Sequence, residues 1–245
     1  MSGHSKWATI KHKKAATDAK RGSLFTKLIK EITIAARGGG KPENNPRLRV
    51  AIERAKEQSM PADNIERAVK KGTGELEGVS YEDVTLEGYG PGGVAIYVEG
   101  VSDNKNRTTS EVRTIFSKNG GNMAGAGSVA WMFEKKGYIV ISKATIDEDK
   151  LMGIALDAGA EDMIVEEENY AVKTSPADFF NVKKAIDDNK INTEDAEITL
   201  LPKSTVKVTG DDVKKILNLV DAIEEHEDVQ HVYANFDIPD ELIKE

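Results

Sequence analysis

The residues of this chain best suited to binding chemistry are the lysines and arginines of its first 37 positions. There are nine of them against two acids, a local net charge of +7, whereas the whole chain carries −8. Cations gathered in this way suit a polyanion, because each one placed near a phosphate releases condensed counterions and gains affinity from that release. The nine are Lys6, Lys11, Lys13, Lys14, Lys20, Arg21, Lys27, Lys30 and Arg37. We therefore expect nucleic acid as the partner of this segment.

Two planar rings, Trp7 and His12, lie among these cations. Rings interleaved with cations are typical of surfaces that stack on bases while the charges contact the backbone. Residues 5–22 offer little apolar surface, so two interpretations stay open: a solvated basic arm, or an arm that becomes ordered on phosphates. Trp7 can also serve as a plain core anchor.

The positive excess extends to residue 72, where 17 basic and 7 acidic side chains give a net charge of +10 and add Arg47 and Arg49 to the candidate contacts. Residues 73–245 are the opposite, with 17 basic and 35 acidic side chains and a net charge of −18. Lys105, Arg107 and Arg113 form a positive island there, at the predicted start of a helix. Helix N-termini favour anions, which suggests a second phosphate contact; a capped helix with solvated charges explains the island equally well.

Catalytic chemistry finds little support in the sequence. There is no cysteine, and none of the four histidines forms an H-x-x-x-H pair. The string Gly88–Gly93 matches G-x-G-x-x-G, but residues 94–98 after it read as a strand where a dinucleotide site needs a helix. We expect a tight reversal between strands at that point. The sequence predicts no cofactor, no metal site and no catalytic residue, and an enzyme with a cleft between α/β domains stays open as an alternative.

Three helices are predicted in the basic region. Residues 23–37 place apolar side chains at the spacing of one buried helical face, and the glycines at 38–40 predict its end. A second helix is expected from Asn45 as cap, with Pro46 at its first position. A third follows Pro61 and ends before Gly72. Together they predict a small helical bundle, with a domain spanning residues 1–76.

Beyond residue 79 the periodicity changes from 3.6 to 2, which is typical of strands. The outer elements predicted are strand 93–100, helix 104–118, strand 128–134, strand 205–209, helix 211–225 and strand 229–236. The residues between them predict strand 138–142, helix 147–158, strands 162–166 and 170–173, helix 176–188 and strand 196–201. This order predicts an α+β multidomain protein in which one ferredoxin-like α/β domain, 136–203, is inserted into another, 77–135 plus 204–240. One larger α/β sheet is the alternative.

The chain strongly resembles the YebC family along most of its length. The residues that carry the resemblance are residues 1–7 (MSGHSKW), Lys13–Ala16, Asp18–Arg21, Phe25–Lys27, Asn45–Arg49, Gly88–Gly93, Asp103–Thr108 and Gly120–Asn122. The resemblance implies a helical first domain followed by two α/β domains. It also implies a regulator: members are described as probable transcriptional regulators that bind DNA, and others act on ribosomes and are linked to relief of stalling at proline runs.

Neither a helix-turn-helix with a clear recognition helix nor a ribonucleoprotein aromatic motif is evident in the sequence. A basic helical module attached to acidic domains suits a crowded RNA surface better than groove readout. We therefore expect a non-enzymatic regulator that binds ribosomal RNA or the ribosome, with a DNA-binding transcriptional regulator as the alternative. Because cysteine is absent and no apolar run approaches the about 20 residues of a membrane span, we expect a cytoplasmic protein with neither membrane nor small-molecule partner.

Overall fold

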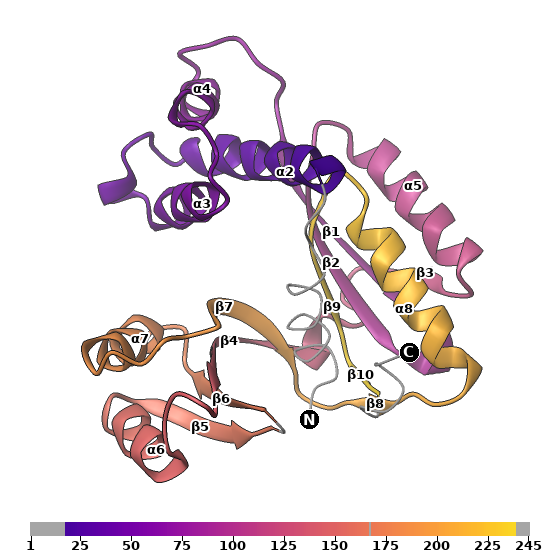
Figure 1. The fold of residues 1–245 in the computed structure, drawn as a ribbon. Coiled ribbons are helices and arrows are strands. Elements are labelled where there is room, and N and C mark those ends of the chain that lie inside the picture. Colours follow the sequence, from indigo (N-terminus) through magenta and orange to yellow (C-terminus); the bar gives the residue numbers. More distant parts are fainter. Residues whose placement is uncertain (1–17, 167, 239–245) are drawn as a thin grey trace.

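A computed structural model describes residues 18–166 and 168–238, with side chains from residue 22 onward. Its first part, residues 18–74, is a bundle that we call the helical unit (Figure 1). The elements are α2 (Asp18–Ala36), η1 (Pro42–Asn44), α3 (Pro46–Glu57) and α4 (Ala62–Thr73). Ile32 of α2, Leu48 of α3 and Ala68 of α4 are buried where the helices meet. The predicted bundle is confirmed.

Local chemistry explains where these helices begin and end. The Asn45 side chain accepts a hydrogen bond from the backbone N–H of Leu48, as predicted for the cap of α3. The predicted end of α4 at Gly72 is wrong, because the helix continues to Thr73 and ends at Gly74, whose φ is +82°. Gly72 lies inside α4, where a methyl group would overlap the carbonyl oxygen of Thr33 in α2. This glycine therefore lets two helix backbones approach closely.

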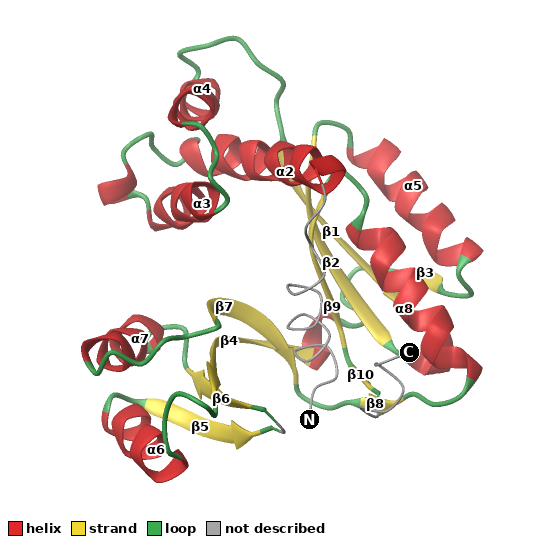
Figure 2. Cartoon of the chain, in the orientation of Figure 1, coloured by secondary structure: helices red, strands yellow, loops and turns green. Residues whose placement is uncertain are grey.

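A four-stranded antiparallel sheet with two helices forms what we call the central unit. Its strands are β1 (Glu82–Tyr89), β2 (Ala95–Ser102), β3 (Asn122–Ala124) and β9 (Val229–Ala234), in the order β3-β1-β2-β9. Helices α5 (Lys105–Lys118) and α8 (Asp211–Glu224) cover one face of the sheet (Figure 2). The short strands β8 (Val206–Lys207) and β10 (Phe236–Asp237) pair in parallel beside it.

One predicted strand of this unit is wrong, strands β1 and β3 are missing from the prediction, and one prediction is confirmed. The predicted strand 128–134 is wrong: the chain forms the 3-10 helix η3 (Ala130–Met132) before the next strand begins at Phe133. The reason is that the Glu87 carboxylate accepts backbone N–H groups of this segment, which are then lost to strand pairing. Strand β1 was not among the predicted elements. The glycine string is confirmed as a reversal between β1 and β2, through η2 (Pro91–Gly93).

Between η3 and β8 the chain builds what we call the inserted unit. Its elements are β4 (Phe133–Ser142), α6 (Glu148–Asp157), β5 (Ala160–Val165), β6 (Asn169–Thr174), α7 (Phe179–Asp188) and β7 (Asp195–Pro202). The antiparallel order β5-β6-β4-β7, with both helices packed on the core residues Ile139 and Val172, is the predicted ferredoxin-like arrangement. The alternative of one larger sheet is wrong, because this sheet is separate from that of the central unit. The exact domain boundaries stay a prediction.

The inserted unit leaves the central unit and returns to it through paired strands. Phe133 of β4 lies opposite Pro202 of β7, and the next backbone bond runs from the Lys203 N–H to the Met132 carbonyl oxygen at 2.9 Å. Phe133 also packs against Tyr97 of β2, with 6.2 Å between ring centroids. Entry and exit therefore form one two-stranded stem, seated on an aromatic cluster of the central sheet.

Candidate nucleic-acid interface

The predicted nucleic-acid contacts fall into three groups. Lys6, Trp7, Lys11, Lys13 and Lys14 lie outside the described residues, so their placement stays a prediction. Lys20 and Arg21 lie in the first turn of α2, where only the backbone is described. The predicted contacts with described side chains are Lys27, Lys30, Arg37, Arg47, Arg49, Lys105 and Arg107.

Lys27 and Lys30 point from α2 into the central unit. The Lys30 Nζ lies 2.6 Å from Asp228 Oδ1 and also donates to the Glu227 carbonyl oxygen at 3.2 Å. Only 8% of the Lys30 side chain and none of the Asp228 side chain is exposed. The Lys27 Nζ donates to the Glu224 carbonyl oxygen at the end of α8. Lys30 is thereby engaged inside the protein, which removes it from the predicted phosphate surface.

Asp228 is the centre of a buried cluster that joins three elements. Arg107 at the start of α5 donates to Asp228 Oδ2 at 2.9 Å, and the hydroxyls of Thr108 and Ser102 donate at 2.6 and 3.1 Å. Burial alone would raise the pKa of Asp228, but the hydrogen bonds from Lys30, Thr108 and Arg107 outweigh it and hold that pKa well below its usual range. The cluster therefore locks the helical unit onto the central unit, and it uses the cation of the predicted island.

Three other predicted cations make exposed contacts. Arg47 bridges Glu31 at 3.0 Å and Asp83 at 2.8 Å, and the hydrogen bond to Asp83 is the main cause of its raised pKa. In the same way Lys105 pairs with Glu82 at 3.1 Å. Arg37 donates to the Ser80 hydroxyl at 2.8 Å. Exposed ion pairs contribute only about 0–1 kcal/mol, so a phosphate can replace the carboxylate at little cost.

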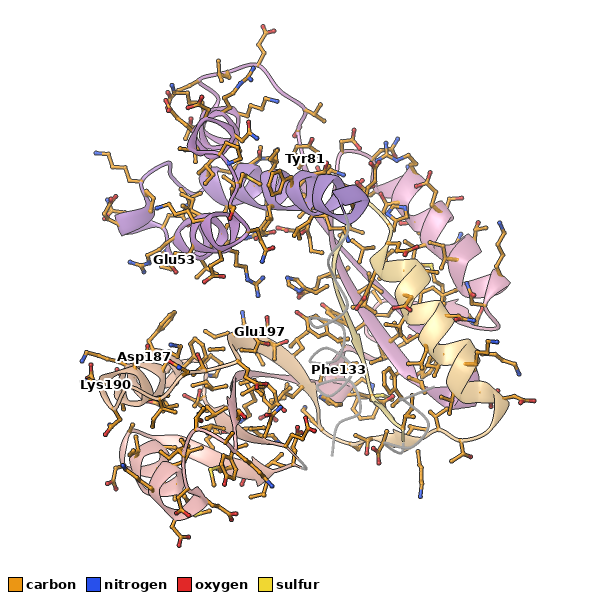
Figure 3. All side chains as sticks on the ribbon, in the orientation of Figure 1. Glu53, Tyr81, Phe133, Asp187, Lys190 and Glu197 are labelled. Carbon is orange, nitrogen blue, oxygen red and sulfur yellow. The ribbon has the colours of Figure 1, made fainter. Side chains whose placement is uncertain are left out.

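Arg49 is exposed, and within the described residues its side chain makes no ion pair or hydrogen bond. It lines a groove of about 370 Å³ together with Val50 and Glu53 of α3 and with Phe180 of α7. The groove therefore lies between the helical unit and the inserted unit. Figure 3 shows Glu53 on the side of α3 that faces the inserted unit. Arg49 is thus the predicted contact that the structure leaves most available.

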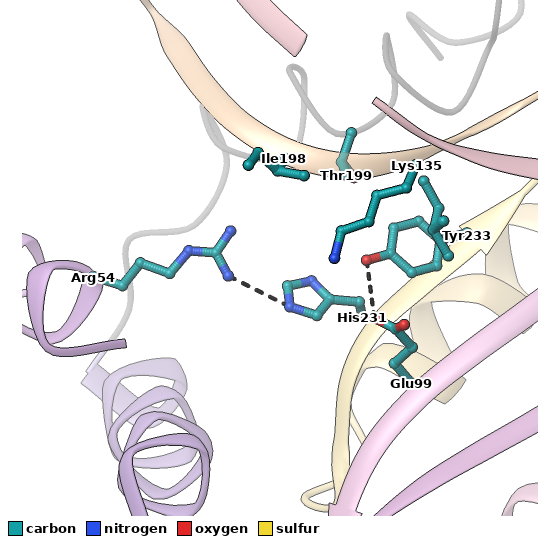
Figure 4. A pocket seen from close by; sticks show the side chains of 8 residues that line it. Arg54, Glu99, Lys135, Ile198, Thr199, His231 and Tyr233 are labelled. Atoms are coloured by element: carbon teal, nitrogen blue, oxygen red, sulfur yellow. Dashed lines mark hydrogen bonds between the residues drawn. The ribbon is translucent and has the colours of Figure 1, made fainter. Parts of the chain in front are cut away.

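A second cavity, of about 130 Å³, lies where all three units meet (Figure 4). Sequence reasoning missed its residues. Arg54 of α3 donates to Glu197 Oε2 of β7 at 2.7 Å and lies 3.4 Å from Nε2 of His231 in β9. Tyr233 stacks on His231 with 5.9 Å between ring centroids, and its hydroxyl donates to Glu99 Oε2 at 3.2 Å. Arg54 therefore closes the helical unit against both other units.

The environment of this cavity shifts the pKa values of its titratable groups, and burial raises that of Glu99. Burial and the positive charges of Arg54 and Lys27 lower the pKa of His231 to about 3, so its neutral ring accepts the hydrogen bond from Arg54. Burial raises the pKa of Tyr233, as does the charge of Glu99. A general acid or base works best when its pKa lies near the pH of the reaction. At pH 7 both His231 and Tyr233 are neutral and do not readily gain or lose a proton. The arrangement suits a structural junction better than a reaction centre.

The described residues contain neither a metal-binding cluster nor a membrane-spanning helix. Among the side chains described, no three from His, Asp and Glu lie close enough together to hold a metal ion. Of the helices placed between residues 18 and 238, none is long and apolar enough to cross a membrane.

The fold thus defines an α+β protein with a helical unit and two antiparallel sheets, one carried as an insertion, and with cations concentrated at its N-terminal end. Comparison with known families agrees. Residues 5–75 match the TACO1/YebC protein N-terminal domain, and residues 81–236 match the TACO1/YebC second and third domain. The chain belongs to the TACO1/YebC family, which confirms the resemblance inferred from its motifs.

Curated relatives match over their full length. One from Desulfatibacillum aliphaticivorans is 59% identical over 246 residues, covering 100% of both chains, and one from Geobacter sulfurreducens is 59% identical over 242 residues, covering 98% of each. Both are named probable transcriptional regulatory proteins, and neither name describes an enzyme. A crystal structure of a conserved hypothetical protein from Aquifex aeolicus is 48% identical, with a TM-score of 0.82 over 94% of this chain and 96% of that one.

Proposed function

We propose that this protein is a cytoplasmic regulator of gene expression that binds ribosomal RNA or the ribosome and relieves stalled translation. The observation that carries the proposal is charge segregation: +7 in the first 37 residues of a chain whose net charge is −8. The positive segment is attracted to phosphates, whereas the negative charge of the remaining residues repels them. The names of the relatives support a regulatory role.

The contacts described above separate the predicted cations into those that hold the units together and those that remain exposed to solvent. Lys30 and Arg107 hold the units together, so the phosphate contacts fall to the cations of residues 6–21 and to the exposed cations Arg37, Arg47, Arg49 and Lys105. Helix α2 continues from residues 18–21 directly into the buried Asp228 cluster. An arm bound to RNA would thereby be anchored firmly to the central unit.

The helical unit offers weak support for reading duplex DNA. Helices α3 and α4 are joined by a short turn at residues 58–61, so α4 is the natural candidate for a recognition helix. The N-terminal residues of a recognition helix contact base edges between two rows of phosphates. In α4 the exposed residues of that end include Asp63, which would repel those phosphates, and Glu66, which pairs with Lys70 on the same helix. This favours RNA, and a DNA-binding regulator stays the second candidate.

The test compares two variants with the same change in charge. One replaces Lys13, Lys14, Lys20 and Arg21 by Gln; its control replaces Lys183, Lys184, Lys214 and Lys215, which lie on α7 and α8, by Gln as well. We expect only the first to stop cosedimenting with ribosomes and to flatten the salt dependence of RNA binding, by about 0.7 in the log–log slope for each phosphate that the protein no longer neutralises. Equal behaviour of both variants would contradict the proposal.

Binding to mixed duplex DNA at the same salt concentration separates the two candidates. Tight, sequence-selective duplex binding without association with ribosomes would favour the DNA-binding regulator. The enzyme alternative places a cleft between the two α/β domains, so it predicts a ligand-dependent activity that survives deletion of residues 1–72.

A further inference from the structure

Trp131 is the most exposed of the large apolar side chains described, with 64% of its surface accessible. It belongs to η3, in the segment that links β3 to the stem of the inserted unit. A tryptophan usually buries most of its large apolar surface. One held open to solvent therefore calls for a binding explanation.

The segment that carries Trp131 is held in place by a buried carboxylate. Glu87 of β1, which is 6% exposed, accepts the backbone N–H groups of Gly127, Val129 and Ala130 at 2.7, 2.6 and 2.9 Å. Burial opposes ionisation of Glu87, but these three donors outweigh it and lower its pKa. The anchor therefore stays charged at neutral pH and fixes the backbone immediately before Trp131.

The ring itself is also fixed in direction. The Trp131 Nε1–H donates to the Ser128 carbonyl oxygen at 3.1 Å, and the same oxygen accepts the Tyr89 hydroxyl at 3.2 Å. Because its one polar atom is satisfied within the loop, the rest of the indole presents a flat apolar surface to solvent. Such a surface binds with little loss of side-chain entropy.

An exposed lysine lies next to the segment that carries this ring, in an otherwise acidic part of the chain. The Lys203 backbone is bonded to Met132, the neighbour of Trp131, and the Lys203 side chain is exposed. Glu134 on β4 pairs directly with Lys136, which is the main cause of its lowered pKa. The charges of Lys203 and Lys173 lower the pKa of Glu134 further. Over the described side chains neither Lys173 nor Lys203 has an ion-pair partner. Lys203 is thus an exposed cation bonded through its backbone to the segment that carries the ring, and Lys173 acts on the same carboxylate, Glu134, from β6.

We propose that Trp131 is a stacking platform for an unpaired base of a bound RNA, with Lys203 contacting an adjoining phosphate. An aromatic face beside backbone-neutralising cations is how single-stranded nucleic acid is held without sequence preference. A protein partner is less suited, because lysine is depleted in the cores of protein interfaces. The choice of RNA rests on the function proposed above; the site itself shares no residue with the basic arm.

Fluorescence isolates this site, because the chain has only two tryptophans. In a Trp7→Phe background Trp131 is the sole indole reporter. We expect its emission to be quenched by short oligoadenosine and not by an abasic oligomer of the same length, which keeps the phosphates but has no base to stack. Trp131→Ala should weaken oligoadenosine binding about 5- to 140-fold, the range of one stacked base, and Trp131→Phe should restore part of it.

Leu156→Ala, at an exposed apolar position of α6, is the control for loss of apolar surface. Equal quenching by the abasic oligomer, or full affinity in Trp131→Ala, would overturn the inference. Quenching by intact ribosomes but not by ribosomal RNA would assign the surface to a protein partner and overturn it as well. If Trp131→Ala binds normally while the four-site arm variant does not, this inference fails and the proposed function stands; if the wild type binds neither RNA nor ribosomes, the proposed function itself fails.

Discussion

Replacing Lys30 by Met tests whether this predicted phosphate contact is structural. Methionine keeps most of the side-chain length and removes the ammonium group that bonds Asp228 and the Glu227 carbonyl. Asp228 then remains fully buried with a negative charge that Arg107, Thr108 and Ser102 still satisfy. The helical unit loses its buried ion pair with the central unit.

The size of the effect follows from this geometry. Removing one partner of a buried ion pair costs about 3–5 kcal/mol when the other charge is left unpaired. Here Arg107 remains 2.9 Å from Asp228, so the loss is closer to one hydrogen bond to a charged group, and we expect about 2–3 kcal/mol. Lys105→Met is the matched control, because its pair with Glu82 is 52% and 61% exposed and should cost less than about 1 kcal/mol.

Urea unfolding followed by circular dichroism measures both variants, and hydrogen exchange locates the effect in α2. We expect faster exchange of the α2 amides in Lys30→Met and wild-type rates elsewhere. A loss below about 1 kcal/mol in Lys30→Met, equal to that of the control, would refute the reasoning. So would weaker RNA binding with unchanged stability, since Lys30 would then be a phosphate contact after all.

Two further predictions concern stability. The low pKa of Asp228 in the folded state stabilises the protein above the unfolded-state pKa of about 4, and this contribution is lost as the pH falls below that value; urea midpoints measured against pH should therefore drop steeply for the wild type and less for Asp228→Asn. Gly72→Ala should destabilise by about 1–3 kcal/mol, because the new methyl group meets the Thr33 carbonyl of α2, whereas Gly22→Ala on the open side of α2 should be neutral or stabilising by thermal unfolding.

The parts of the fold that follow from local chemistry could be predicted from the sequence. Asn45 with Pro46 marked the start of α3, and the apolar spacing of residues 138–201 gave the order of the inserted unit. The wrong prediction at 128–134 has a different cause. The sequence pattern of that segment is typical of a strand. However, the carboxylate of Glu87, some 40 residues earlier, accepts hydrogen bonds from its backbone N–H groups, and the local sequence gives no sign of these bonds.

The same limit applies to the candidate site. Charge segregation is visible in the sequence, yet the partner of each cation is not. Lys30 meets Asp228 at a separation of 198 residues, and Arg54 reaches His231 across 177. Burial then decides which cations are structural and which stay available. The exposure of Trp131 could not be predicted for a related reason. The residues around it have a pattern typical of a strand, where a tryptophan is expected to be buried, and only the structure shows that it is exposed.

The stem at Phe133 and Pro202 has a consequence for how such a chain can evolve. The two ends of the inserted unit lie side by side. Such a unit can be inserted, replaced or shortened without breaking the strand pairing of the central sheet. The helical unit and the central unit are joined by contacts that do not pass through this module, such as the Asp228 cluster. The central sheet can therefore keep its shape while the sequence and length of the inserted unit change.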